Sequence, residues 1–128
     1  MADLVLDTSL LIDWSRGVSG VAEFVASVSP GTRFRIHPVT IAEFLAGLRD
    51  KREQTAGDWF LSQFRSVWPS SAHFEQCLGL VRAHRLAGGI EWPDCLIAST
   101  CLRLGLGLVT LNDKHFRQIR GLKVVRPY

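Results

Sequence analysis

The stretch LVLDTSLLID, residues 4–13, places a carboxylate directly after a short apolar run. Residues 4–7 have the character of a buried strand, and residues 8–16 carry apolar side chains at helical spacing. An Asp at such a junction is usually a helix N-cap, because its side-chain oxygen accepts hydrogen bonds from the first helical turn. Asp7 is therefore either a cap or one member of a group of acids, depending on where the other carboxylates fall.

Length and composition indicate one globular domain that spans residues 1–128. The hydrophobic fraction is 47% and the charged fraction 21%, which is ordinary for a folded protein in water. Apolar runs stay well below the roughly 18–20 residues that a membrane span needs. The chain starts with an early acid and then a core strand, which is unlike a signal peptide, so no membrane contact and a cytoplasmic location are expected.

Three cysteines, Cys77, Cys95 and Cys101, lie within apolar helical patterns and lack C-x-x-C spacing. An odd number in this setting favours buried free thiols over disulfides or a zinc site. The formal net charge is +3. If several acids were neutralised by a bound cation, the remaining surface would be clearly basic.

Strand and helix patterns alternate along the chain. Strands are expected at residues 4–7, 33–39, 66–69, 106–112 and 123–127, and helices at residues 8–16, 19–28, 40–52, 56–64, 72–88, 93–105 and 113–121. Thr40 is expected to be the N-cap of its helix, with Glu43 completing a capping box. This alternation predicts a three-layer α/β/α fold with a central, mainly parallel sheet.

Acidic residues fall at helix beginnings in four places. Asp7 and Asp113 follow predicted strands, and Glu43 and Asp94 are placed in first helical turns ahead of strongly apolar runs. Ligands of open parallel sheets collect where strands end and helices begin. Buried carboxylates that converge repel one another unless a cation lies between them. A set of oxygen ligands selects Mg²⁺ or Mn²⁺ over zinc.

Four motifs in this order resemble the PIN domain, and specifically the VapC toxins of type II toxin–antitoxin modules. The motifs are LDTSLLID at residues 6–13, VTIAEFLAGL at 39–48, PDCLIASTCLRLGLGLVTLN at 93–112 and TLNDKHF at 110–116. The resemblance covers essentially the whole chain. It implies a PIN-like α/β/α domain with an acidic pocket that binds Mg²⁺ and cleaves RNA by metal-assisted phosphodiester hydrolysis.

The resemblance also implies roles for individual residues. Asp7, Glu43 and Asp94 match the first three acids of the family, and all three are expected to be catalytic. The fourth family position corresponds to Asn112, while the acid actually present is Asp113, so both stay open. Asp113 is taken as a catalytic residue and, with Asp7 and Asp94, as a metal ligand.

The catalytic acid Glu43 and several supporting side chains have separate expected roles. Glu43 is expected to orient or deprotonate the attacking water. Side chains expected to orient carboxylates or water are Thr8 or Ser9, Thr110 and Asn112. His115 is expected to be a surface or capping residue.

Partners follow from the same resemblance. RNA is the expected substrate, and Lys114 and Arg117 are the basic residues placed nearest the scissile phosphate. A VapB-type antitoxin is expected to cover the acidic pocket, and two copies of the chain are expected to form a homodimer. The residues around AGDWFLSQFRSVW, 56–68, carry more large apolar side chains than one helix face needs, which is typical of a partner surface.

Other classes fit less well. Phosphatases that form an aspartyl-phosphate need a second Asp two residues after the first, where this chain has Ser9. Receiver domains need an adjacent acidic pair, and Asp3 and Asp7 are poorly spaced for one. A non-catalytic PIN-fold module that binds RNA or protein remains the alternative to an enzyme.

Overall fold

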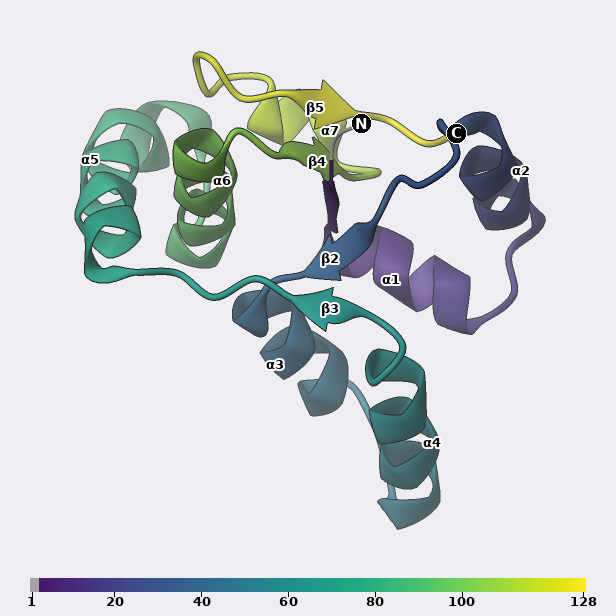
Figure 1. Cartoon of the computed structure of the whole chain (residues 1–128). Coiled ribbons are helices and arrows are strands. Elements are labelled where there is room, and N and C mark those ends of the chain that lie inside the picture. Colours follow the sequence, from purple (N-terminus) through teal and green to yellow (C-terminus); the bar gives the residue numbers. More distant parts are fainter. Residues whose placement is uncertain (1–2) are drawn as a thin grey trace.

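A five-stranded parallel sheet forms the centre of the computed structural model, which describes residues 3–128 (Figure 1). The strands lie in the order β3-β2-β1-β4-β5, and every neighbouring pair is parallel. Their bounds are β1 (Leu4–Leu6), β2 (Phe34–Ile36), β3 (Arg65–Ser66), β4 (Gly107–Val109) and β5 (Val124–Val125). The expected parallel sheet is therefore confirmed, with strands shorter than their sequence patterns suggested.

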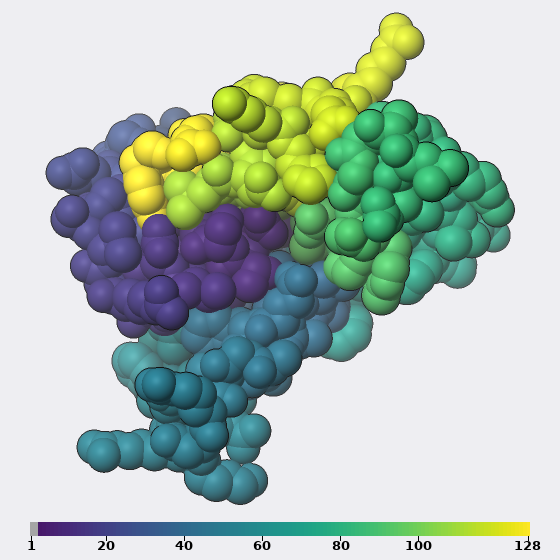
Figure 2. Space-filling model, turned by 180° about the vertical axis from the view of Figure 1, so that it is seen from behind, coloured from purple at the N-terminus to yellow at the C-terminus, as the bar shows by residue number. Residues whose placement is uncertain are grey.

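Helices cover both faces of the sheet, which gives the expected three layers. One face packs against α1 (Thr8–Ser15), α2 (Ser19–Ser27), α3 (Pro38–Ala46) and α4 (Lys51–Leu61). The other packs against α5 (Ser71–Gly88), α6 (Trp92–Leu104) and α7 (Asp113–Phe116). Figure 2, seen from behind, shows the α4 region projecting at the bottom of the molecule.

Successive strand residues point to opposite faces, and this divides the core in two. Val5 and Leu108 are fully buried beneath α5 and α6, while Leu6 and Val109 are fully buried beneath α1 and α3. Both faces of β1 and β4 are therefore apolar, as is usual in parallel sheets. Polar side chains enter the core from these two strands at the residues that follow them.

The three central strands end at the same level. Leu6 is in register with Ile36 of β2 and with Val109 of β4. The next residues of these strands, Asp7, His37 and Thr110, therefore form one row along the carboxyl edge of the sheet, and all three are buried.

The start of α3 differs from the sequence prediction. Thr40 is not the N-cap: the helix begins at Pro38, and His37 caps it by accepting the Val39 N–H at Nδ1 over 3.1 Å. Proline is favoured in the first turn because it lacks an N–H that would otherwise need a partner. Glu43 consequently lies in the second turn of α3 and forms no capping box.

Cys77, Cys95 and Cys101 are buried free thiols, as expected. Burial raises the pKa of Cys101 to about 12, so this thiol stays protonated. None of the helices within residues 3–128 combines the length and the apolar character that a membrane crossing needs.

Candidate functional site

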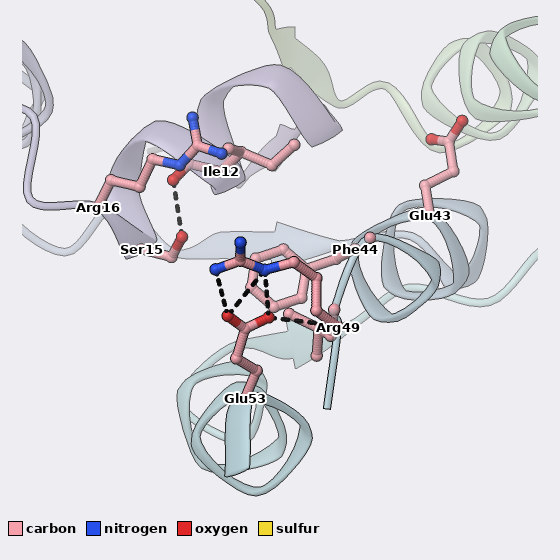
Figure 3. A pocket seen from close by; sticks show the side chains of 9 residues that line it. Ile12, Ser15, Arg16, Glu43, Phe44, Arg49 and Glu53 are labelled. Carbon is pink, nitrogen blue, oxygen red and sulfur yellow. Dashed lines mark hydrogen bonds and ion pairs between the residues drawn. The ribbon is translucent and has the colours of Figure 1, made fainter. Parts of the chain in front are cut away.

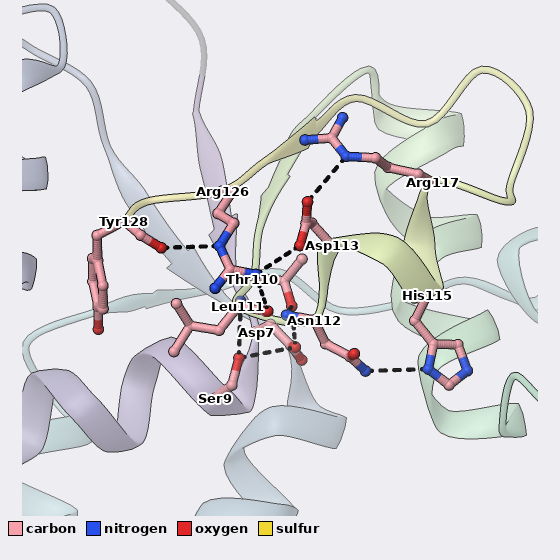
Figure 4. Close-up of polar contacts among 10 residues, drawn as sticks. All are labelled: Asp7, Ser9, Thr110, Leu111, Asn112, Asp113, His115, Arg117, Arg126 and Tyr128. Carbon is pink, nitrogen blue, oxygen red and sulfur yellow. Dashed lines mark hydrogen bonds and ion pairs between the residues drawn. The ribbon is translucent and has the colours of Figure 1, made fainter.

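Asp7 stands directly after β1 and is 7% exposed. Although it occupies the N-cap position of α1, its side chain makes no capping hydrogen bond. Oδ2 instead accepts a hydrogen bond of 2.7 Å from the Thr110 hydroxyl and one of 3.3 Å from the Ser9 hydroxyl (Figure 4). The carboxylate is thus held by two hydroxyls, one from the residue after β4 and one from the first turn of α1, rather than by the backbone N–H groups of the helix.

Glu43 reaches the same edge from α3. Its Oε1 accepts a hydrogen bond of 2.6 Å from the Thr8 hydroxyl, the first residue of α1. Glu43 also lies at one end of a cleft of about 490 Å³ between α1 and the α3–α4 region (Figure 3). One end of the cleft therefore opens at a carboxylate, while Phe44 and Leu48 line its interior.

Asp94 is partly buried in the first turn of α6. Burial first, and then the negative charges of Asp7 and Glu43, raise the pKa of its carboxyl to about 6. His115 acts in the opposite sense on the same pKa. The structure thus brings together three acids, from residues 7, 43 and 94, closely enough to repel one another.

These carboxylates fit a hard divalent cation. The donor set consists of oxygen atoms alone, which suits Mg²⁺ or Mn²⁺ and disfavours zinc. Within residues 3–128, no three acidic, histidine or cysteine side chains lie near enough together to hold an ion in the present conformation. Part of the rise in the Asp94 pKa comes from repulsion by Asp7 and Glu43, and a bound cation would remove that part.

Asp113 is not brought into this group. Its Oδ1 accepts a hydrogen bond of 2.8 Å from Arg126, and its Oδ2 accepts one of 3.2 Å from Arg117. These two guanidinium groups, Arg126 first, lower the pKa of the Asp113 carboxyl. Figure 4 shows the side chain directed toward Arg117 and Arg126 and away from Asp7.

The side chain of Asn112, in the same loop, points toward His115. Its side-chain nitrogen lies 3.2 Å from Nδ1 of His115, and its backbone N–H donates to the Thr110 hydroxyl over 2.9 Å. The other ring nitrogen of His115, Nε2, is buried and lacks a partner among the described residues. His115, expected to be a surface or capping residue, is partly exposed and also lowers the pKa of Asp94.

Lys114 of α7 and Arg117, at the C-cap of the same helix, differ in their surroundings. Lys114 is exposed. Arg117 is half-exposed and is engaged by Asp113 over 3.2 Å. Lys114 is therefore the more available of the two for a phosphate group.

Comparison with known proteins agrees with this geometry. Residues 4–122 match the family described as the PIN domain. The chain belongs to the PIN domain family. This confirms the resemblance and the fold class inferred from the four motifs.

Relatives of this PIN domain include a named ribonuclease and chains of toxin–antitoxin complexes. Ribonuclease VapC10 of Mycobacterium tuberculosis (strain CDC 1551 / Oshkosh) is 30% identical over 123 residues, which cover 94% of this chain and 90% of the relative. A toxin–antitoxin complex from Klebsiella pneumoniae contains a chain that is 27% identical, with a TM-score of 0.78 and 98% of each chain covered. DNA-bound VapBC from Salmonella typhimurium has the same fold, with a TM-score of 0.81 at 24% identity and full coverage of both chains.

Asp94→Asn is expected to stabilise the metal-free protein at neutral pH. Because the folded pKa of about 6 lies above the ordinary 3.8, the unfavourable charge is fully present above pH 6 and disappears as pH falls toward 3.8. The gain should be about 1–2 kcal/mol at pH 7.5, since a pKa unit is roughly 1.4 kcal/mol and solvent screens part of the charge.

The measurement is chemical unfolding in EDTA at pH 7.5 and pH 4.5. The control is Asp58→Asn, which removes an exposed carboxylate of α4. A gain that is equal at the two pH values would contradict the assigned repulsion.

Proposed function

We propose that this PIN domain is the toxin of a type II toxin–antitoxin module and acts as a Mg²⁺-dependent endoribonuclease in the cytoplasm. The observation that carries the proposal is the convergence of three acids at the carboxyl edge of the sheet: Asp7 follows β1, Glu43 is bonded to Thr8, and Asp94 lies in the first turn of α6. Burial, and then the charges of Asp7 and Glu43, raise the pKa of Asp94 to about 6. Repulsion of this kind at the carboxyl edge of a parallel sheet is typical of a cation site. Relatives named as ribonucleases support the same activity.

Asp7 and Asp94 are the residues proposed to hold the metal. A bound Mg²⁺ or Mn²⁺ would polarise a phosphoryl oxygen and acidify a water molecule. The hydroxyls of Thr110 and Ser9 fix the Asp7 carboxylate in one orientation. That fixed orientation leaves its other oxygen, Oδ1, available for a ligand.

Glu43 is proposed to act on the attacking water. It is exposed, lies at the mouth of the cleft and is held by Thr8 through one oxygen only. Its second oxygen can accept a proton from a water molecule placed between it and the phosphate. Since no hydroxyl is bonded to that oxygen, proton transfer there breaks no hydrogen bond.

Asn112 is proposed as the fourth residue of the pocket. Asp113 would first have to leave Arg126 and Arg117, and hydrogen bonds between charged groups are among the stronger ones. Asn112 is held only by the His115 ring, so its amide oxygen is open to a metal-bound water. On this proposal Asp113 orients the loop rather than binding the ion.

RNA is proposed to approach over α7. Lys114 is exposed beside the pocket loop, and Arg117 lies one turn further on. Cations placed there would contact the phosphates that flank the scissile bond. Lys114 carries most of this role because Arg117 already pairs with Asp113.

A VapB-type antitoxin is proposed to occupy the cleft that ends at Glu43. Apolar side chains of Ile12, Phe44 and Leu48 line it, and Trp59 of α4 stands beside its continuation with 70% of its surface exposed. A basic side chain of the antitoxin, such as Arg, could then pair with the acids and displace the metal. The relatives solved as VapBC complexes support such a partner.

Two copies of the chain are proposed to associate as a homodimer. The helix α5 exposes apolar side chains along its length, at Phe74, Leu78 and Leu86. An exposed apolar surface of this kind is typical of a protein–protein contact.

Cleavage of RNA should require a divalent cation and the three acids. Asp7→Asn should abolish Mn²⁺ binding in calorimetry. Glu43→Gln should lower the cleavage rate by about 10²- to 10⁴-fold, while Mn²⁺ still binds up to about tenfold more weakly because Glu43 contacts the ion through its bound water. The measurements are titration with Mn²⁺ and cleavage of a fluorescent RNA with and without EDTA.

The matched variant for this test is Asp113→Ala, whose carboxylate is bonded to arginines. It should weaken Mn²⁺ binding less than Asn112→Ala does, because Asp113 acts on the site only through the position of its loop. Cleavage that persists in EDTA, or in Asp7→Asn at the wild-type rate, would indicate another nuclease chemistry. Absence of cleavage by the wild type with Mn²⁺ present would leave a non-catalytic binding module. The opposite order of the two loop variants would return the metal-ligand role to Asp113.

RNA affinity should fall steeply with salt, and Lys114→Ala should flatten that dependence. Loss of one phosphate contact lowers the slope of log K against log salt by about 0.7 for single-stranded RNA. The measurement is fluorescence anisotropy in EDTA with a labelled RNA between low and moderate salt.

Lys123→Ala is the control, because Lys123 precedes β5 at the opposite edge of the sheet. Equal slopes for Lys114→Ala and Lys123→Ala would place the RNA elsewhere. Adding Arg117→Ala should change the slope less than Lys114→Ala does.

The antitoxin encoded beside this gene should bind the cleft, and Trp59→Ala should weaken the complex by about tenfold or more, as for a buried aromatic at an interface. Trp68→Ala is the control because Trp68 is equally exposed, at 70%, but does not line the cleft. Affinity is measured by calorimetry with the purified antitoxin. Equal losses in both variants would contradict the docking site.

The chain alone should scatter light as a dimer at micromolar concentration. A monodisperse monomer would contradict the proposed homodimer.

A further inference from the structure

His37 is a fully buried histidine for which the proposed reaction has no use. Its side chain is 0% exposed, and it follows β2 in the same row in which Asp7 follows β1 and Thr110 follows β4. Burying a polar ring is unfavourable unless its nitrogens are hydrogen-bonded. Both nitrogens of His37 have partners, and those partners belong to two different helices.

The first partner is the beginning of α3. Pro38 has no N–H, so Val39 carries the first backbone donor of the helix, and that N–H donates to Nδ1 of His37 over 3.1 Å. Proline also disfavours the helical conformation in the residue before it, and His37 is accordingly extended, with φ −87° and ψ 148°. The dipeptide His37–Pro38 thus determines where α3 begins.

The second partner is the middle of α6. Nε2 of His37 lies 3.1 Å from the Thr100 hydroxyl, which in turn lies 2.9 Å from the carbonyl oxygen of Leu96. Since the Val39 N–H can only donate, Nδ1 must be the acceptor and Nε2 must carry the proton. His37 therefore donates to Thr100, Thr100 donates to Leu96, and every polar atom of this chain of bonds is satisfied.

The ring is kept neutral by its surroundings. Burial, with a smaller contribution from the nearby His73, lowers the pKa of His37 to about 4. A protonated ring would present an N–H to the Val39 N–H and would break the cap. The neutral form is thus the one that joins the two helices.

We propose that His37 is a positioning residue that holds Glu43 and Asp94 at a set separation by tying the start of α3 to the middle of α6. Glu43 lies six residues after His37 on α3, and Asp94 lies six residues before Thr100 on α6. The inference rests on the proposed function in assigning these two acids to one metal site.

The direct packing of α3 on α6 is limited to a small area, so the hydrogen bonds matter for their alignment. Glu43 reaches the site as an exposed side chain and Asp94 as a partly buried one. A slide of α3 along α6 would move the first carboxylate relative to the second while leaving the sheet intact. His37 opposes that slide because it is bonded to both helices at once.

The test uses Mn²⁺ alone and the full-length chain. Thr100→Val removes the hydroxyl that accepts the hydrogen bond from His37 Nε2. This change should weaken Mn²⁺ binding about three- to tenfold. His37→Asn keeps an acceptor for the Val39 N–H, loses the reach to Thr100, and should give the same loss. The double variant should be no worse than either single one, because both remove one link.

Two further variants separate positioning from general loss of packing. Thr40→Val makes the same change in a buried threonine of α3 whose hydroxyl has no partner among the described residues, and it should bind Mn²⁺ like the wild type. Thr100→Ser keeps the hydroxyl and should restore affinity. In RNA cleavage, Thr100→Val should lower kcat and leave KM unchanged.

The outcomes are distinct. Thr100→Val and His37→Asn that bind Mn²⁺ like Thr40→Val overturn the role of His37 and leave the proposed function standing. Additive losses in the double variant also overturn it, because they mean two separate effects. A wild-type chain that binds no Mn²⁺ overturns both proposals.

Discussion

The common end point of three parallel strands is the constraint on which the rest of the molecule depends. Because Leu6, Ile36 and Val109 are in register, the residues after them stand side by side at one edge of the sheet. Both faces of β1 and β4 are apolar and covered, so this edge is where polar groups can approach the core. The helices that leave the edge then deliver the other acids.

Like charges at this edge oppose folding, and neighbouring hydroxyls moderate the effect. Thr110 and Ser9 donate to Asp7, and Thr8 donates to Glu43, so two carboxylates have polar partners in the absence of any cation. Within residues 3–128 no hydroxyl donates to Asp94, and burial together with the charges of Asp7 and Glu43 raises its pKa. A protein arranged in this way is less stable than it could be, which is common where a site must bind an ion.

The C-terminal segment stabilises the loop on the other side of the edge. Arg126 donates to the Leu111 carbonyl and to Asp113, and the Tyr128 hydroxyl donates to Asp13 of α1 over 2.7 Å. These bonds connect the end of the chain to both the pocket loop and the first helix. An acid that looks like a metal ligand in the sequence is thereby used to hold the loop that carries Asn112.

Local sequence determined the alternation of strands and helices, the parallel sheet and the places of Asp7 and Asp94, because apolar periodicity and helix-start signals act over a few residues. It did not determine the beginning of α3. The sequence pattern of Thr40 and Glu43 predicts a capping box, but the helix begins two residues earlier, at Pro38, and is capped by His37. Only the tertiary structure determined the hydrogen-bond partners of Asp113, because Arg126 lies 13 residues away in the sequence. The same is true of the hydrogen bond from Thr8 to Glu43, which spans 35 residues. Such choices depend on which side chains the sheet brings together, and that information is not carried by neighbouring residues.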